Sequence, residues 1–206
     1  MSDINKFLKA FWIYYLELEK QFVETKRYIE LSAKNNSAFS VEYLKLYQAV
    51  CSEIDVVGKY IAEDTVPDFK ANNHTNIKKW GFNLQKSFGN IKDTLVSVND
   101  LYLVQPFKNW QYEECDIKKS GKIVKELRIV GGKKTIPWWT TYNKVKHQRV
   151  GLITGEKYYV LANQKNVVLS LSALYLLEWK YLMSIGDDVS LANISHSQLF
   201  EIRQRP

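Results

Sequence analysis

The stretch that decides the fold is residues 137–149, which read Pro-Trp-Trp-Thr-Thr-Tyr-Asn-Lys-Val-Lys-His-Gln-Arg. A proline at its start needs no N–H partner in the first turn of a helix, so the stretch predicts a short helix. At helical spacing Trp138, Tyr142 and Val145 share an apolar face. A second face presents an indole, a carboxamide, an ammonium and an imidazole: Trp139, Asn143, Lys146 and His147.

The second face is the candidate for chemistry. An imidazole one helical turn from a carboxamide, with an ammonium beside it, can move a proton or hold a phosphate oxygen. We therefore take His147 as a candidate general acid or base, Asn143 as the residue that orients it, and Lys146 as a phosphate neutraliser. The structural alternative is a polar cluster that joins this helix to its neighbours.

Positive charge is concentrated around this stretch. The chain has a net charge of +7, and residues 117–149 contain ten basic residues against one acidic residue, a net +9. Basic residues interleaved with aromatic rings are typical of a surface that binds nucleic acid. The candidate RNA-binding residues are Trp139, Lys144, Arg149, Lys133 and Lys134. The alternative is that the basic residues form a solvated strand edge that prevents sheet pairing.

Long helices are predicted on both sides of the stretch. Aromatic and aliphatic residues recur at three- and four-residue intervals over residues 5–33, and again over residues 40–62, where Ser40 is a plausible N-cap. Their short connection predicts an antiparallel helical hairpin. A last helix, from about residue 166 to Ile185, is apolar almost all round and should be the most buried element, ending at Gly186.

Between these helices the sequence predicts a small insertion, at about residues 95–136. Residues 95–110 favour extended structure, and Gly131-Gly132 reads as the two-residue turn of a β-hairpin formed by residues 122–130 and 133–136. Residues 187–206 read as a polar tail on the surface. The sequence therefore predicts one all-α domain, residues 1–206, with a β-hairpin insertion.

Composition and motifs exclude several classes of protein. With 46% hydrophobic residues the chain can bury a core without disulfides, and its two cysteines show neither metal-ligand spacing nor a disulfide framework. No zinc, magnesium, Walker or serine-hydrolase motif is present, so we expect no metal and no cofactor. The amino terminus lacks a secretory pattern, and no apolar run spans a bilayer, so we expect a cytoplasmic protein without a membrane partner.

The order of these features resembles the HEPN superfamily, the helical-bundle proteins of prokaryotic defence and toxin systems. Two long helices and an irregular middle precede Tyr142-Asn143-Lys144-Val145-Lys146-His147, and a buried last helix follows. The resemblance implies a homodimer and a metal-independent ribonuclease site, in which an Arg and a His from each protomer meet. His147 matches the histidine. In the family the residue after the arginine is often polar, commonly Asn, and Asn143 matches that position, whereas Tyr142 stands where the arginine would be.

Two functions of different classes follow. In the first, the chain is a dimeric RNA-binding protein of a prokaryotic defence or toxin–antitoxin system. It then has metal-independent endoribonuclease activity at His147, Asn143 and Lys146. An operon-encoded protein is a further expected partner. The alternative is a non-catalytic helical module for protein–protein interaction.

Overall fold

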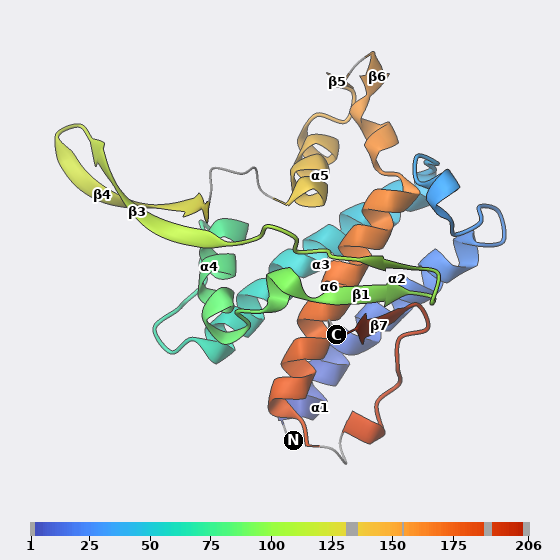
Figure 1. Ribbon diagram of the computed structural model, residues 1–206, viewed down its shortest axis with the longest axis horizontal. Coiled ribbons are helices and arrows are strands. Elements are labelled where there is room, and N and C mark those ends of the chain that lie inside the picture. The colour runs from blue at the N-terminus through green and yellow to red at the C-terminus, as the bar shows by residue number, and fades with distance from the viewer. Residues whose placement is uncertain (1–2, 131–135, 154, 188–190, 204–206) are drawn as a thin grey trace.

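The computed structural model describes residues 3–130, 136–153, 155–187 and 191–203 (Figure 1). Its first helical segment consists of α1 (Asp3–Phe7), a π-helical turn (Leu8–Trp12) and α2 (Ile13–Thr25). The predicted end at Ala33 is wrong. The helix ends at Thr25, and the amides of Lys26, Arg27 and Tyr28 bond to carbonyls three residues back in a tighter turn. Beyond that turn the carbonyl of Glu30 accepts a hydrogen bond from Nε2 of Gln164 at 3.0 Å.

Two long helices form the centre of the core. The helix α3 (Val41–Thr65) begins as predicted, because the Oγ of Ser40 accepts a hydrogen bond from the amide of Tyr43 at 3.0 Å. The helix α6 (Gln164–Ile185) ends before Gly186 and is buried along most of its length, which confirms the prediction for the last helix. In Figure 1 α2 and α3 run in opposite directions, and α6 packs along α3.

Two shorter helices flank α3. They are α4 (Ile77–Ser87) and α5 (Pro137–His147), the second being the helix predicted from residues 137–149. Gly58 lets α4 approach α3 closely, since a Cβ at this position would lie 2.7 Å from the ring of Trp80. Short 3₁₀ segments lie between these helices, among them Ala33–Asn35, Ile91–Asp93 and Tyr158–Leu161.

The fold is mixed α/β, so the prediction of an all-α domain is wrong. A three-stranded antiparallel sheet has the order β2-β1-β7, formed by β1 (Leu95–Val98), β2 (Tyr102–Val104) and β7 (Phe200–Arg203). Val96 of the central strand pairs with Val104 on one side and with Ile202 on the other. The sheet was missed because its third strand comes from the tail, about a hundred residues after the first two.

A buried carboxylate holds the tail in place. Glu19 of α2 accepts hydrogen bonds from the hydroxyl of Tyr15 at 2.6 Å, from the hydroxyl of Ser197, and from the amide of Gln198 at 2.8 Å. Leu199 and Phe200 are then buried in the core. The polar tail predicted for residues 187–206 is therefore, in its described part, an ordered segment that completes a sheet.

A second, two-stranded sheet projects from the helices (Figure 1). It consists of β3 (Tyr112–Lys119) and β4 (Lys122–Ile129), and we call residues 112–129 the arm. Its turn is Ser120-Gly121, with φ angles of 49° and 80°, and not the predicted Gly131-Gly132, which lies outside the described residues. Because solvent surrounds most of the arm, β3 lacks the alternating pattern that identifies a half-buried strand. A third sheet pairs β5 (Leu152–Ile153) with β6 (Glu156–Lys157).

The helix α6 is long and apolar enough to cross a membrane by length and composition alone. However, 67% of its most apolar window is buried inside the structure, where it packs against α3 and the aromatic residues of α1 and α2. This burial is typical of the core helix of a soluble protein.

Candidate functional site

The apolar face of α5 is buried as predicted and fixes the helix against its neighbours. Trp138 donates a hydrogen bond from Nε1 to the carbonyl of Pro106 at 2.8 Å, and its own carbonyl accepts a hydrogen bond from the hydroxyl of Tyr47. The ring of Tyr142 packs edge-on against Tyr47, with the ring centroids 6.1 Å apart. These contacts turn the adjacent face of α5, which carries Trp139, Asn143 and Lys146, toward α3 and the start of α4.

A pocket of about 360 Å³ opens between these three helices. We call it the α5 pocket. Its polar lining combines hydroxyls, carboxamides, one carboxylate and two ammonium groups, and its apolar lining is mainly aromatic: Ser52, Asp55, Thr75, Asn76, Ile77, Lys78, Trp139, Tyr142, Asn143 and Lys146.

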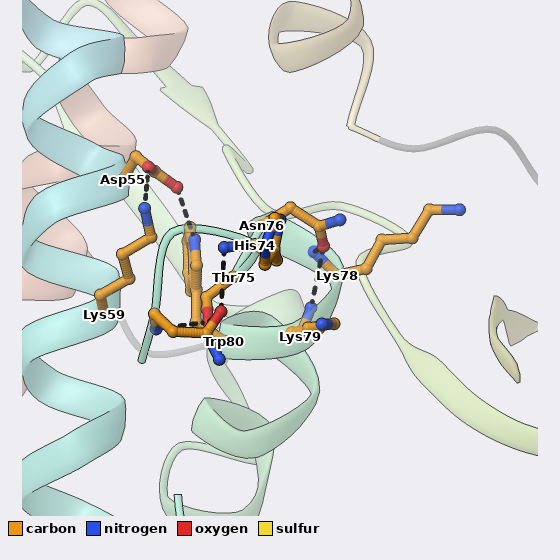
Figure 2. Close-up of polar contacts among 9 residues, drawn as sticks. Asp55, Lys59, His74, Thr75, Asn76, Lys78, Lys79 and Trp80 are labelled. Carbon is orange, nitrogen blue, oxygen red and sulfur yellow. Dashed lines mark hydrogen bonds and ion pairs between the residues drawn. The ribbon is translucent and has the colours of Figure 1, made fainter. Parts of the chain in front are cut away.

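The loop before α4 presents the amino-terminal end of that helix to the pocket. The Oδ1 of Asn76 caps α4 by accepting hydrogen bonds from the amides of Lys78 and Lys79, at 3.1 and 3.3 Å. The first turn contains no acidic residue. In Figure 2 the side chain of Lys78 extends away from the network of hydrogen bonds, and among the described residues no ion pair engages it.

The single carboxylate of the pocket is already neutralised. Oδ2 of Asp55 lies 2.5 Å from Nζ of Lys59, and Oδ1 accepts a hydrogen bond from Nε1 of Trp80 at 2.9 Å (Figure 2). Asp55 therefore repels an anion much less than a free carboxylate would. Lys78 and Lys146 are left as the uncompensated charges of the pocket lining.

Lys146 and Tyr142 lie together on the α5 side. The Nζ of Lys146 stands 5.6 Å from the centroid of the Tyr142 ring, a cation–π distance. Burial, followed by the proximity of Cys51 and Asp55, raises the pKa of Tyr142 to about 12. The phenol therefore keeps its proton at neutral pH and can donate a hydrogen bond.

The predicted catalytic residues do not all lie at one site. Asn143 and Lys146 line the α5 pocket, whereas His147 does not. His147 is exposed at the last position of α5, and within the described part of the chain it has no hydrogen bond to Asn143. The three residues share a helix without forming one chemical group.

The predicted RNA-binding residues also lie in different parts of the structure. Trp139 lines the pocket, but Lys144 points to another side of α5, where its Nζ lies 5.4 Å above the ring of Tyr158. Arg149 is exposed in the turn after α5. Lys133 and Lys134 lie outside the described residues.

The arm carries less net charge than the sequence suggested. Its eighteen residues, 112–129, include five basic and four acidic side chains, a net charge of +1. Two ion pairs form within it, Lys125 with Glu114 at 3.1 Å and Arg128 with Glu126 at 3.4 Å. The excess of positive charge on the arm is therefore limited to its tip.

Residues outside the 137–149 stretch complete the site, and they are not among the site residues predicted from the sequence. Asp55 and Lys78 come from α3 and α4, far from α5 in the sequence. One local signal was available for α4: Asn76 is a favourable N-cap, and two lysines follow it where acidic residues are preferred. No local signal indicates that α3 and α5 meet at Asp55.

Comparisons with protein-family models, with curated proteins and with solved structures give no match to this chain. The resemblance to the HEPN superfamily therefore stays a prediction. The described residues contain no group of three or more histidine, cysteine, aspartate or glutamate side chains able to hold a metal ion.

Proposed function

We propose that this protein binds single-stranded RNA and that the α5 pocket holds a phosphate of the RNA backbone. The observation that carries the proposal is that Lys78 and Lys146 both line one pocket, whose single lining carboxylate, Asp55, is paired with Lys59. Two ammonium groups that form no ion pair with the described acidic residues attract a phosphate and release its counterions on binding. The proposal extends the predicted RNA-binding surface to α4.

The partial positive charge at the amino terminus of α4 adds to this attraction. Since Asn76 already accepts from the amides of Lys78 and Lys79, the ammonium groups make the direct contacts in the proposed complex. An ammonium binds phosphate as a point charge and reads no sequence.

Two neutral groups can contact the nucleotide beside that phosphate. The carboxamide of Asn143 offers both a donor and an acceptor to a base edge, and the hydroxyl of Tyr142 offers a donor. Trp139 is 8% exposed, which leaves little of its ring for stacking. We therefore propose weak base preference and binding dominated by the phosphate.

The proposed activity is binding, and cleavage is no part of it. A general base must lie within hydrogen-bond reach of the ribose hydroxyl that it deprotonates. His147 lies outside the lining that contains Asn143 and Lys146, and its side chain is exposed. The resemblance to HEPN proteins supports RNA as the ligand, a cytoplasmic location and a role in a defence system with an operon-encoded partner.

Fluorescence anisotropy with a labelled 12-nucleotide oligouridine RNA tests the proposal. Lys146→Ala should raise the dissociation constant roughly tenfold, because one charge-assisted contact contributes about 1.5 kcal/mol. The matched control is Lys34→Ala, which removes an exposed lysine from the connection between α2 and α3. Equal affinities for both variants and the parent would contradict the proposal. Incubating the same RNA with the protein in EDTA and finding it intact supports binding without cleavage.

A further inference from the structure

The outer edge of β3 is a free strand edge. Within the described residues β3 pairs with β4 alone, and the arm contacts the body through its base, where Tyr112 and Ile129 are buried. Beyond that base the arm stands clear of the helices (Figure 1). A two-stranded hairpin is only marginally stable in water, and an unpaired edge is a template for another strand.

Charge is distributed unevenly along β3. The first half of the strand is acidic, with Glu113, Glu114 and Asp116, and the second half is basic, with Lys118 and Lys119. Such a strand is complementary to itself when two copies run antiparallel, because each acidic half then faces a basic half.

We propose that the β3 edges of two copies of this chain pair antiparallel and join the two arms into a four-stranded sheet, β4-β3-β3-β4. The two-fold axis passes beside Ile117, so that Ile117 faces Ile117 of the second copy. Asp116 then faces Lys118 of the second copy, and the same pair forms twice by symmetry. Glu114 is a diagonal neighbour of the same lysine.

The backbone of the arm agrees with this register. Positive φ angles at Ser120 and Gly121 make a two-residue turn, so the pair Lys119 and Lys122 that flanks it exchanges hydrogen bonds. Because bonded and non-bonded pairs alternate along an antiparallel ladder, Asp116 and Lys118 direct their amides and carbonyls outward. These are the two residues that the proposed register brings together.

The composition of the arm favours a second protein copy over RNA. Its net charge is only +1, and the half-buried Ile117 lies directly opposite Val124 on one face. In the proposed dimer these side chains from both copies form one apolar patch at the centre of the sheet. This dimer is independent of the proposed RNA binding, since none of its residues lines the α5 pocket.

Reversing charges on half of β3 tests the proposal. Lys118→Glu/Lys119→Glu makes the whole edge acidic. Glu114→Lys/Asp116→Lys/Lys125→Glu makes it basic and keeps the ion pair between residues 114 and 125 in reversed form. In sedimentation velocity the parent should form a dimer of twice its 24.1 kDa mass, and each variant alone should sediment as a monomer. Mixed in equal amounts, the two variants should form a heterodimer.

The control excludes attraction by net charge alone. Lys34→Glu/Lys165→Glu changes the net charge by the same amount as Lys118→Glu/Lys119→Glu, but at exposed positions outside the arm. It should remain a dimer alone and should form no heterodimer with the basic-edge variant. A parent that is monomeric at all concentrations, or a mixture of the two arm variants that fails to associate, overturns the proposal. Loss of RNA binding in Lys118→Glu/Lys119→Glu with a monomeric parent would show that the arm is an RNA-binding surface instead.

Discussion

Trp80 donates a hydrogen bond from Nε1 to Oδ1 of Asp55 over 2.9 Å, and this bond connects α4 to the face of α3 that lines the α5 pocket. It is possible because Gly58, one turn along α3 from Asp55, leaves room for the indole ring. A glycine in the middle of α3 and an aspartate on its surface thus determine where Lys78 lies.

The first prediction concerns Gly58→Ala. Alanine normally stabilises an exposed helix interior by about 1 kcal/mol relative to glycine. Here the new methyl group would lie 2.7 Å from the Trp80 ring, so we expect a net loss of roughly 1–3 kcal/mol in the free energy of unfolding. Urea denaturation measures this loss, with Val56→Ala on the exposed side of the same helix as the control. An increase in stability would show that α4 lies farther from α3.

The second prediction concerns a buried carboxyl group. Glu178 of α6 is fully buried, and neither of its oxygens has a hydrogen-bond partner among the described residues. Burial, followed by the proximity of Glu53, raises its pKa well above the ordinary value. Folding therefore favours the protonated form. Its contribution to stability is fully present below the unfolded pKa of about 4.3 and is lost as the pH rises toward the folded pKa.

Replacing Glu178 removes that titration. Glu178→Leu should raise the melting temperature at pH 8, by roughly 2–4 °C for each kcal/mol gained, and should change it little at pH 4. Differential scanning calorimetry at the two pH values measures the difference. Glu17→Leu, at an exposed position of α2, is the control. A variant that is less stable than the parent at pH 8 would indicate that Glu178 has a partner when ionised.

The elements predicted correctly have strong local signals. Ser40 as N-cap, Pro137 at the start of α5 and Gly186 after α6 each act on the helix that they border. The elements predicted wrongly are those whose conformation depends on contacts with residues distant in the sequence. Glu30, which the sequence predicts inside the first helix, bonds through its carbonyl to Gln164, and the tail becomes a strand because Glu19 holds it. Neither contact leaves a pattern in the nearby sequence.

The third prediction concerns the anchor of the tail. Glu19→Ala would leave the amide of Gln198 without its acceptor, and would leave the hydroxyl of Tyr15 and the amide of Leu199 with the Oγ of Ser197 alone. We expect a loss of about 1–3 kcal/mol in the free energy of unfolding, because a buried donor is left unsatisfied. Limited proteolysis should then cleave the chain near residue 198. Glu17→Ala, two residues away and exposed, should resist cleavage as the parent does. Equal resistance of both variants would contradict the role of Glu19.

The fourth prediction concerns His147, the residue that the sequence placed at the centre of the chemistry. Because its side chain is exposed at the end of α5, His147→Ala should change the free energy of unfolding by no more than about 0.5 kcal/mol. RNA affinity should also stay within twofold. Thermal melting and anisotropy measure the two effects. RNA cleavage by the parent that the variant loses would instead establish His147 as catalytic.

The site could be predicted from sequence only in part. Trp139, Asn143 and Lys146 lie together because they share one face of a single helix, which periodicity reveals. Lys78 and Asp55 join them through the packing of α3 and α4, which periodicity does not encode. Charge counted along the chain was misleading for the arm, because it omitted the acidic residues of β3 that precede the basic ones.

The central claim is that Lys78 and Lys146 hold an RNA phosphate, and the salt dependence of affinity tests it most directly. For single-stranded RNA each phosphate contact contributes about 0.7 to the slope of log K against log salt concentration. Because both lysines contact the same phosphate in the proposed complex, Lys78→Ala/Lys146→Ala should reduce the magnitude of the slope by about 0.7 relative to the parent. The charge-matched control Lys34→Ala/Lys165→Ala should leave it unchanged. The same slope in the parent and in Lys78→Ala/Lys146→Ala would contradict the claim.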